Sequence, residues 1–351
     1  MKILSIGGFS AYGVSNTCLH RNWALHKLAE VDDIDTSYMS KTLVYRIVNR
    51  LFVRYNLPIH CPAGRLNRKI RKSFSQKKYD IVWIDKGVFI SAKTLSYIKK
   101  SSPDTLIVGY SPDNMTERFS HSQHFLDSLP YHDYYVTTKS DSVESLKQLG
   151  AKNVIVVNNA FEPSFHHPYN LSQHEKERLG GKVGFIGRWE KERCDSMIYL
   201  VNNGVQVRIW GGGKWLKYKD KYPNLIVEQK GLFSEDYNKA LSAFDISLCF
   251  LSKLNTDRQT TRTMEIPACG SMLMAERTKE HQELFEEDKE AVFFSSNEEL
   301  LEKCRYYLAH PQERTKIAEA GHRRCIESDY SNLGMIKRVI AQIKNENTIH
   351  I

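Results

Sequence analysis

Acidic and basic side chains crowd into the stretch from Asp257 to Glu276. Arg258 and Arg262 lie between Asp257 and Glu265, four positions apart, which is the spacing of neighbours on one helix face. Such a group at a helix start could bind a ligand, or it could form simple charge pairs along the helix. The spacing alone leaves both interpretations open.

A second basic group, Gly187–Arg193, follows a strand-like run and opens a helical pattern. Backbone N–H groups at a helix start bind anions, and Arg188 and Arg193 would add two guanidinium groups. The pattern predicts a turn that binds a diphosphate. We favour this over a charged surface turn because ligands of parallel sheets bind at the carboxyl ends of strands.

Three consecutive glycines, Gly211, Gly212 and Gly213, follow another predicted strand. They would allow a phosphate or a flat ligand to approach the backbone closely, although a tight turn explains them equally well. The surrounding sequence is not a P-loop. The absence of a correctly placed G-x-G-x-x-G argues against a dehydrogenase.

Asp113 follows the predicted strand 106–110 within the sequence Ser-Pro-Asp-Asn. A carboxylate at this position could act as a general base towards an acceptor hydroxyl. A plain Pro-Asp turn is the less favoured alternative.

Metal-binding patterns are weak. Asp33 and Asp35 form an acidic pair, but they precede or begin a predicted strand over 35–39, at the edge opposite the expected site. His121 and His124 have no further ligand nearby in the sequence. We therefore expect no metal and no other cofactor.

Strand-like runs alternate with helical patterns in both halves of the chain, which predicts parallel sheets with helices on both faces. We predict an N-terminal Rossmann-like domain over 1–165, a polar linker over 166–182 and a second Rossmann-like domain over 183–330. A C-terminal helix over about 331–347 could pack back on the first domain. Two doubly wound domains in tandem are expected to face each other across a ligand cleft.

A glycine-containing loop follows the first predicted strand, 2–7. We expect it to line the ligand site of the N-terminal domain, because it too lies at the carboxyl end of a strand. Its candidate residues are Gly7, Gly8, Tyr12 and Gly13.

The composition is that of an ordinary globular protein, with 41% hydrophobic and 26% charged residues among 351. No run is long enough for a transmembrane helix, and residues 1–10 lack a signal-peptide pattern. The seven cysteines are scattered, without a C-x-x-C pair, which disfavours a disulfide framework or a zinc site. We expect a cytoplasmic protein.

The formal net charge of +9 is concentrated in residues 41–78, which contain no Asp or Glu. A helix there would carry an apolar face flanked by Arg46, Arg50 and Arg54. This pattern fits a helix lying on anionic lipid, and it fits equally a domain helix whose apolar face is in the core. No nucleic-acid recognition motif is present, so we expect no such partner.

Several stretches resemble the CgeB/YkvP-like glycosyltransferases of the GT-B superfamily. The most specific are RTMEIPACGSMLMAE, HQELFEEDKEAVFF and ELLEKCRYYLAHPQERTKIAEAGHRR. Weaker likeness extends to SPDNM, VTTKSDSVESLKQLGAKNVIVVNNAF and FIGRWEKER. The resemblance covers most of residues 79–328 and implies a GT-B fold with the nucleotide-sugar donor in the C-terminal domain.

The resemblance also implies roles for individual residues. Glu265 matches the family's ribose-binding Glu, and Asp257 occupies the place of an acid that contacts the donor sugar, as Asp instead of Glu. Arg188 and Arg193 match the diphosphate-binding bases. Two roles stay open for Arg262: it could contact a phosphate, or it could orient Glu265.

The function implied is transfer of a sugar, of hexosyltransferase type, to a hydroxyl of a cell-surface glycan or lipid-linked acceptor, in polysaccharide biosynthesis. The family generally needs no metal. The expected partners are the donor, the acceptor and an anionic membrane surface met by residues 41–78, with a peripheral location on the inner face of the cell membrane. A GT-B-fold sugar-nucleotide epimerase and a non-catalytic protein that kept the fold are the alternatives.

Overall fold

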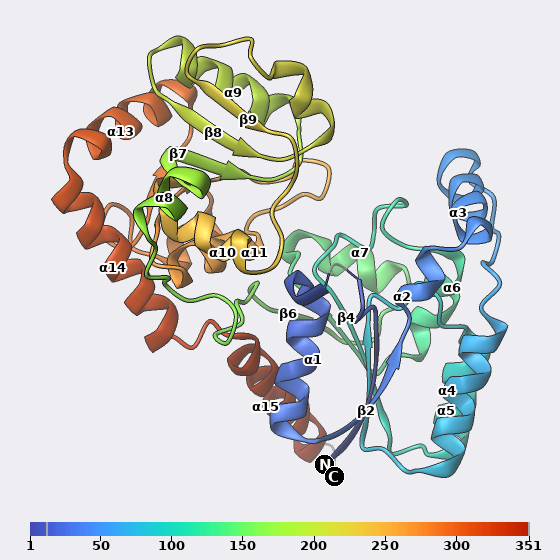
Figure 1. The fold of residues 1–351 in the computed structure, drawn as a ribbon. Helices are drawn as coiled ribbons and strands as arrows, with labels where there is room; N and C mark the ends of the chain where they lie inside the picture. Colours follow the sequence, from blue (N-terminus) through green and yellow to red (C-terminus); the bar gives the residue numbers. More distant parts are fainter. Residues whose placement is uncertain (12, 350–351) are drawn as a thin grey trace. The chain divides into compact units, whose positions relative to one another are not determined.

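The computed structural model describes residues 1–11 and 13–349, and in it the chain forms two compact units (Figure 1). Unit 1 consists of Met1–Asn158 together with α15 (Asn332–Ile349), and unit 2 consists of Asn159–Ser331. Each unit contains a six-stranded parallel sheet. The predicted α/β class and GT-B architecture of two Rossmann-like domains are confirmed.

The sheet of unit 1 has the strand order β2-β1-β3-β4-β5-β6. Its strands are β1 (Lys2–Gly7), β2 (Glu30–Asp35), β3 (Ile81–Asp85), β4 (Leu106–Ser111), β5 (Tyr134–Thr137) and β6 (Val154–Val156). The central strands β3 and β4 are almost wholly buried. This burial is typical of a parallel sheet that is covered on both faces.

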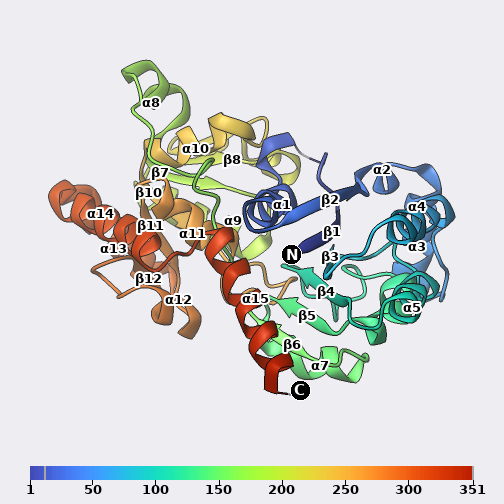
Figure 2. The same ribbon diagram turned by 90° about the horizontal axis from the view of Figure 1, so that it is seen from below.

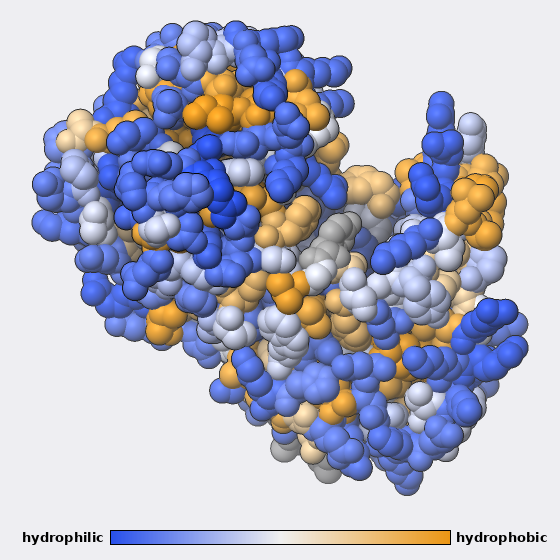
Figure 3. All heavy atoms as spheres, in the orientation of Figure 1, coloured by the Kyte–Doolittle hydropathy of each residue, from blue (hydrophilic) through white to orange (hydrophobic). Residues whose placement is uncertain are grey.

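The helices of unit 1 are α1 (Thr17–Leu28), α2 (Ser37–Ser40), α3 (Leu43–Tyr55), α4 (Gly64–Gln76), α5 (Ala92–Ser101), α6 (Gln123–Ser128), α7 (Val143–Gln148) and α15. On one face of the sheet α1 and α15 lie side by side, and on the other face lie α4 and α5 (Figure 2). Apolar and charged side chains are exposed next to each other over α3 (Figure 3).

The sheet of unit 2 has the order β12-β11-β10-β7-β8-β9. Its strands are β7 (Gly181–Ile186), β8 (Val207–Trp210), β9 (Leu225–Glu228), β10 (Phe244–Cys249), β11 (Met272–Glu276) and β12 (Val292–Phe294). Its helices are α8 (Gln173–Leu179), α9 (Lys191–Asn202), α10 (Ser234–Ala243), α11 (Thr261–Ala268), α12 (Lys279–Leu284), α13 (Asn297–Ala309) and α14 (Pro311–Glu327).

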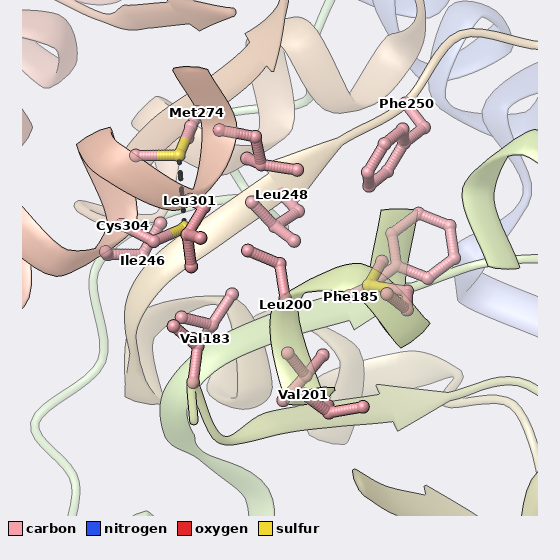
Figure 4. Packing of buried hydrophobic residues seen from close by; sticks show 14 of the residues in the cluster. Val183, Phe185, Leu200, Val201, Ile246, Leu248, Phe250, Met274, Leu301 and Cys304 are labelled. Atoms are coloured by element: carbon pink, nitrogen blue, oxygen red, sulfur yellow. Dashed lines mark hydrogen bonds between the residues drawn. The ribbon is translucent and has the colours of Figure 1, made fainter. Parts of the chain in front are cut away.

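Alternate residues of the strands in unit 2 feed two separate cores. In β11, Met272 and Met274 point into one core, whereas Leu273 and Ala275 point into the other. In the first core, side chains from β7, α9, β10 and α13 converge, and the Cys304 thiol lies 3.6 Å from the sulfur of Met274 (Figure 4). Cores on both faces hold the sheet rigidly, so the loops at its ends have fixed starting points.

Both sheets have a point where the strand order reverses. In unit 1 the chain goes from β1 outwards to β2 and then returns to β3 on the other side of β1. In unit 2 it goes from β7 through β8 to β9 and returns to β10 on the other side of β7. In open parallel sheets, the loops at the carboxyl ends of such neighbouring strands form the ligand site.

The boundary between the units falls after Asn158, earlier than the expected end of the first domain at 165. The segment that follows is bound to unit 2, because Phe161 is buried in the second core and the Asn159 N–H donates to Gln259 Oε1 at 3.0 Å. The stretch 166–182, expected as a linker, contains α8 and the start of β7.

The prediction of a strand over 35–39 is wrong. The strand of this region is β2, which ends at Asp35 and is followed by α2. Its sequence, EVDDID, is too polar to suggest a strand. No helix within residues 1–11 and 13–349 has the length and apolar character that crossing a membrane requires.

Candidate functional site

In unit 2, the turns after β7 and β8 pack directly on each other. The Gly187 N–H donates to the Trp210 carbonyl at 3.0 Å, and the Trp215 indole donates to the Gly187 carbonyl at 3.0 Å. A Cβ at Gly211 would lie 2.3 Å from the Gly187 carbonyl oxygen, so only glycine fits there. This contact brings the two predicted glycine turns to one edge of the sheet.

The other two glycines of the cluster have different surroundings. Gly213 has a φ of +66° and begins the short 3₁₀ helix Gly213–Tyr218, a backbone conformation that favours glycine. A Cβ at Gly212 would meet nothing closer than 3.5 Å. The tight-turn interpretation therefore accounts for Gly211 and Gly213, and the space beside Gly212 remains open to a ligand.

Arg193 lies in the first turn of α9 and is buried, with 8% of its surface exposed. One guanidinium nitrogen lies 2.9 Å from Glu190, and another donates to the Arg188 carbonyl at 3.2 Å. Its Nε is buried and has no hydrogen-bond partner among the described residues. Burial lowers the pKa of Arg193, so keeping its guanidinium group charged in this site costs free energy. The Arg188 side chain itself is exposed.

Arg262 lies in the first turn of α11, where Thr260 caps the helix and accepts from the Arg262 N–H at 3.1 Å. Its Nε is also buried without a hydrogen-bond partner in the part of the chain that the structure describes. The charge of Arg262 contributes to lowering the pKa of Arg193, which places the two guanidinium groups within electrostatic reach of each other. The first turns of two helices thus present two guanidinium groups with unused donor capacity.

Glu265 faces inwards from α11 and is 5% exposed. Its carboxylate accepts from the Tyr237 hydroxyl, and its other oxygen lies 3.5 Å from His166 Nε2. Burial lowers the pKa of His166 to about 3, so this imidazole is neutral at neutral pH. The negative charge of Glu265 also acts on Arg262 and helps to keep the pKa of that residue raised against the effect of burial.

Asp257 closes the loop after β10. Its carboxylate accepts from the Ser252 N–H at 3.2 Å and from the Asn255 side chain at 2.8 Å. Glu276, at the end of β11, accepts from the Leu251 N–H at 2.6 Å and so fixes the start of the same loop. Asp257 acts electrostatically on both Arg193 and Arg262, and it therefore belongs to the same group of charges.

In unit 1, Asp113 follows β4 and forms an ion pair with Lys86, at 2.6 Å between Oδ2 and Nζ. Burial opposes the charged form of Asp113, but Lys86, together with Lys139 and Arg21, keeps the pKa of this carboxyl below its usual value. Asp113 is therefore ionised at neutral pH. Its low pKa makes it a weaker proton acceptor than an unpaired carboxylate.

A buried ion pair next to Asp113 escaped the sequence analysis. Arg21 of α1 donates from Nε to Asp85 Oδ2 at 2.7 Å and from Nη2 to Oδ1 at 3.1 Å. The guanidinium also lies 4.3 Å from the centre of the Tyr110 ring. The partners are 64 positions apart, and the only signal was the position of Asp85 at the end of a predicted strand.

The loop after β1 is fixed by Asp35, which accepts from the Phe9 N–H at 3.0 Å and from the Ser10 hydroxyl. A Cβ at Gly7 would lie 2.7 Å from the Cys18 sulfur, whereas Gly8 has room, and Gly13 has a φ of +59°. Tyr12, the fourth candidate in this loop, lies outside the described residues.

A cavity of about 240 Å³ lies at the carboxyl edge of the sheet in unit 1. Side chains with hydroxyl groups and two charged groups contribute to its wall, and its lining includes Thr36, Ser37, Ser40, Tyr45, Asp85 and Lys86. Gly8 also lines it, in agreement with the expectation that the glycine loop borders a ligand site. Apolar side chains form much of the rest of the wall, including Ile6, Ile84, Val88, Phe89 and Ile90, so the cavity combines apolar surface with a few polar groups.

Arg46, Arg50 and Arg54 lie at exposed positions of α3. Within residues 1–11 and 13–349, no group of three or more His, Cys, Asp or Glu side chains is arranged to hold a metal ion.

Comparison with known proteins finds a related family for part of the chain. Residues 193–339 match the family described as glycosyl transferase-like. No curated protein sequence matches the chain.

Solved structures share the fold at low sequence identity. Anabaena HepE in complex with UDP-glucose is 15% identical with a TM-score of 0.62, covering 98% of this chain and 100% of that one. Sucrose-phosphate synthase from Thermosynechococcus elongatus is 10% identical with a TM-score of 0.67, covering 100% of both chains. A candidate UDP-N-acetylglucosamine 2-epimerase from Listeria monocytogenes is 12% identical with a TM-score of 0.55, covering 99% and 96%.

The narrower likeness to the CgeB/YkvP-like proteins stays a prediction. The chain has the GT-B fold of the glycosyltransferases, and its residues 193–339 match the glycosyl transferase-like family.

Proposed function

We propose that this protein is a glycosyltransferase that moves a hexosyl group from a nucleotide-sugar to a hydroxyl of a glycan or lipid-linked acceptor, in polysaccharide biosynthesis. The observation that carries the proposal is the pair of arginines in unit 2. Arg193 and Arg262 each bury an Nε that has no hydrogen-bond partner among the described residues. An unsatisfied buried donor is costly, and the oxygens of a diphosphate would accept from both Nε donors.

The same groups would assist the reaction. Negative charge grows on the diphosphate as the glycosidic bond breaks, and fixed donors aimed at that charge stabilise the transition state. Because two guanidinium groups and two helix N-termini supply the positive charge, we propose that no metal is needed. Turnover that survives EDTA would support this part, and loss of turnover restored by Mg²⁺ would contradict it.

The remaining residues have proposed roles around this centre. Glu265 would hold the ribose hydroxyls, Asp257 would contact the donor sugar, and Asp113 would deprotonate the acceptor if the reaction inverts configuration. The cavity in unit 1, which has both hydroxyl groups and apolar side chains in its wall, would bind the acceptor. An anionic membrane surface is a further proposed partner, through residues 41–78. The seven free cysteines support a cytoplasmic location.

A thermal-shift screen tests the donor. A ligand that binds only the folded state, at a hundred times its Kd, adds about 2.7 kcal/mol of stability. UDP-sugars are the first to test, because HepE is a UDP-glucose complex; GDP-, ADP-, CMP- and dTDP-sugars follow. If none of them shifts the unfolding temperature, the non-catalytic alternative is favoured.

Product analysis separates transfer from epimerisation. A bound nucleotide-sugar that changes into its epimer, without an acceptor, would favour the epimerase. Release of the nucleoside diphosphate only in the presence of an added acceptor would support the transferase.

A further inference from the structure

We propose that α3 of unit 1 lies on the surface of an anionic lipid bilayer, with an apolar strip inserted between the headgroups. The inference rests on the proposed function, whose membrane partner it assigns to α3, but it does not depend on the donor site. The sequence alone left open whether the apolar side chains of this helix lie in the core.

The sequence predicts an apolar face of Val44, Ile47, Val48, Leu51 and Tyr55, and the structure leaves three of these side chains exposed. Val44 is 51% exposed, Ile47 52% and Tyr55 59%, and Leu43 at the start of the helix is 68% exposed. The side of the helix that packs on unit 1 is formed by Tyr45, Val48 and Phe52, so it includes Val48 of the predicted face. Arg118 holds this side of the helix in place. Its Nε donates to the Phe52 carbonyl at 2.7 Å, and its guanidinium group lies over the Phe52 ring.

A basic strip runs along the helix beside the apolar one. Arg46, Arg50 and Arg54 recur every four positions and are exposed. None of the three forms an ion pair with another described residue. There is no Asp or Glu between Asp35 and Asp80 in the sequence, so nothing nearby along the chain neutralises them.

These two strips together identify the partner. An apolar strip alone would fit another protein, and a basic strip alone would fit any polyanion. A helix with both, side by side, has the arrangement of one that lies in a membrane interface with its arginines at anionic headgroups. Tyr38 and Leu57, just before and after the helix in the sequence, are also exposed.

Co-sedimentation with vesicles tests the proposal on the full chain. The vesicles are pure phosphatidylcholine, or an equimolar mixture of phosphatidylcholine and phosphatidylglycerol. We expect binding to the anionic vesicles only, weakened by salt. The combined change Arg46→Gln, Arg50→Gln and Arg54→Gln should weaken it about 100-fold, at the usual contribution of a basic residue near such a surface.

A matched control removes the same charge elsewhere. Lys217→Gln, Lys219→Gln and Lys221→Gln change exposed residues of unit 2 and should leave vesicle binding almost unchanged. A second variant, Leu43→Ser, Val44→Ser and Ile47→Ser, should bind about tenfold more weakly, because less apolar area enters the interface. All changed side chains are exposed, so unfolding temperatures should match that of the wild type.

Four results would overturn the proposal. The first is no binding to anionic vesicles, and the second is equal binding by the arginine variant and the wild type. The third is tighter binding to RNA than to the vesicles. The fourth is a wild type that does not bind vesicles but associates with itself, when the serine variant abolishes that self-association.

Discussion

The carboxyl edges of the two sheets use arginine in opposite ways. In unit 1, Arg21 donates two hydrogen bonds from its guanidinium group to the Asp85 carboxylate, and Lys86 forms an ion pair with Asp113. In unit 2, Arg193 and Arg262 keep buried Nε donors that no described residue accepts from.

The difference indicates what each edge binds. Charges that are already paired leave a nearly neutral wall, which suits an uncharged ligand with hydroxyl groups. A buried donor without an acceptor is unfavourable, so an anion that accepts hydrogen bonds from these donors gains binding free energy. The contrast therefore supports the proposal that unit 2 binds the anionic donor and unit 1 an uncharged acceptor, although the two sheets share one design.

The variant with the largest expected effect on this contrast is Arg193→Ala. It removes positive charge where the leaving diphosphate develops negative charge, and we expect turnover to fall by about 10²- to 10³-fold. Arg193→Lys keeps the charge but loses the forked geometry and should retain an intermediate rate. Steady-state rates with the donor found in the thermal-shift screen measure the effect. Near-normal turnover of the alanine variant would refute the assigned role.

The matching change in unit 1 is Asp113→Asn. If Asp113 is the base, turnover should fall by about 10²-fold, while calorimetry shows unchanged affinity for the nucleoside diphosphate. Lys86→Met should raise the pKa of Asp113, because it removes the cation that holds that pKa down. The acid limb of the pH–rate profile should therefore move to higher pH. A limb that does not move means that another group is the base, or that none is needed.

Glu265→Gln tests the ribose contact with a smaller expected effect. It keeps the shape of the side chain inside its buried site but removes the charge that accepts from Tyr237. We expect calorimetry to show binding of the nucleoside diphosphate about tenfold weaker, the usual size for one hydrogen bond to a charged group. The same affinity in variant and wild type would leave Glu265 with a structural role only.

The last test concerns stability in acid and not activity. Native His166 stays neutral down to a pKa of about 3, whereas an unfolded histidine binds a proton near pH 6.5. Between these values the unfolded state binds more protons, so the free energy of unfolding falls as the pH falls, by up to about 1.4 kcal/mol per pH unit. His166→Asn should flatten this slope in urea melts.

His132 allows the same measurement in unit 1, because burial lowers its pKa to about 4. Comparison of His132→Asn with His166→Asn shows which unit limits stability in acid. Unchanged slopes in both variants would mean that carboxylates alone cause the loss of stability.

The repeated elements of the fold could be predicted from the sequence, because they depend on local patterns. Buried parallel strands such as β10 and β11 are apolar runs bounded by loops. The strand β2 could not be found in this way, since EVDDID lies at the edge of the sheet and much of it faces water. Its stability comes from pairing with β1, which a local pattern does not contain.

The site was predictable where chain order alone brings residues to one edge. Gly187, Arg193 and Glu265 follow neighbouring strands, so their approach follows from the topology. The neutral His166 beside Glu265 was not predictable, because it comes from the segment that the sequence suggested as a linker. The spacing of α3 showed its apolar and basic strips, but only packing decides which strip faces water.

The return of the chain to unit 1 has a consequence for folding. Unit 2 is continuous in the sequence, whereas the two segments of unit 1 are separated by the whole of unit 2, so unit 1 is complete only when α15 joins it. Met335, Ile336, Val339, Ile340 and Ile343 of α15 are buried. Until α15 has docked, unit 1 exposes the surface of α1 that this helix covers, and such transiently exposed surface favours aggregation during folding.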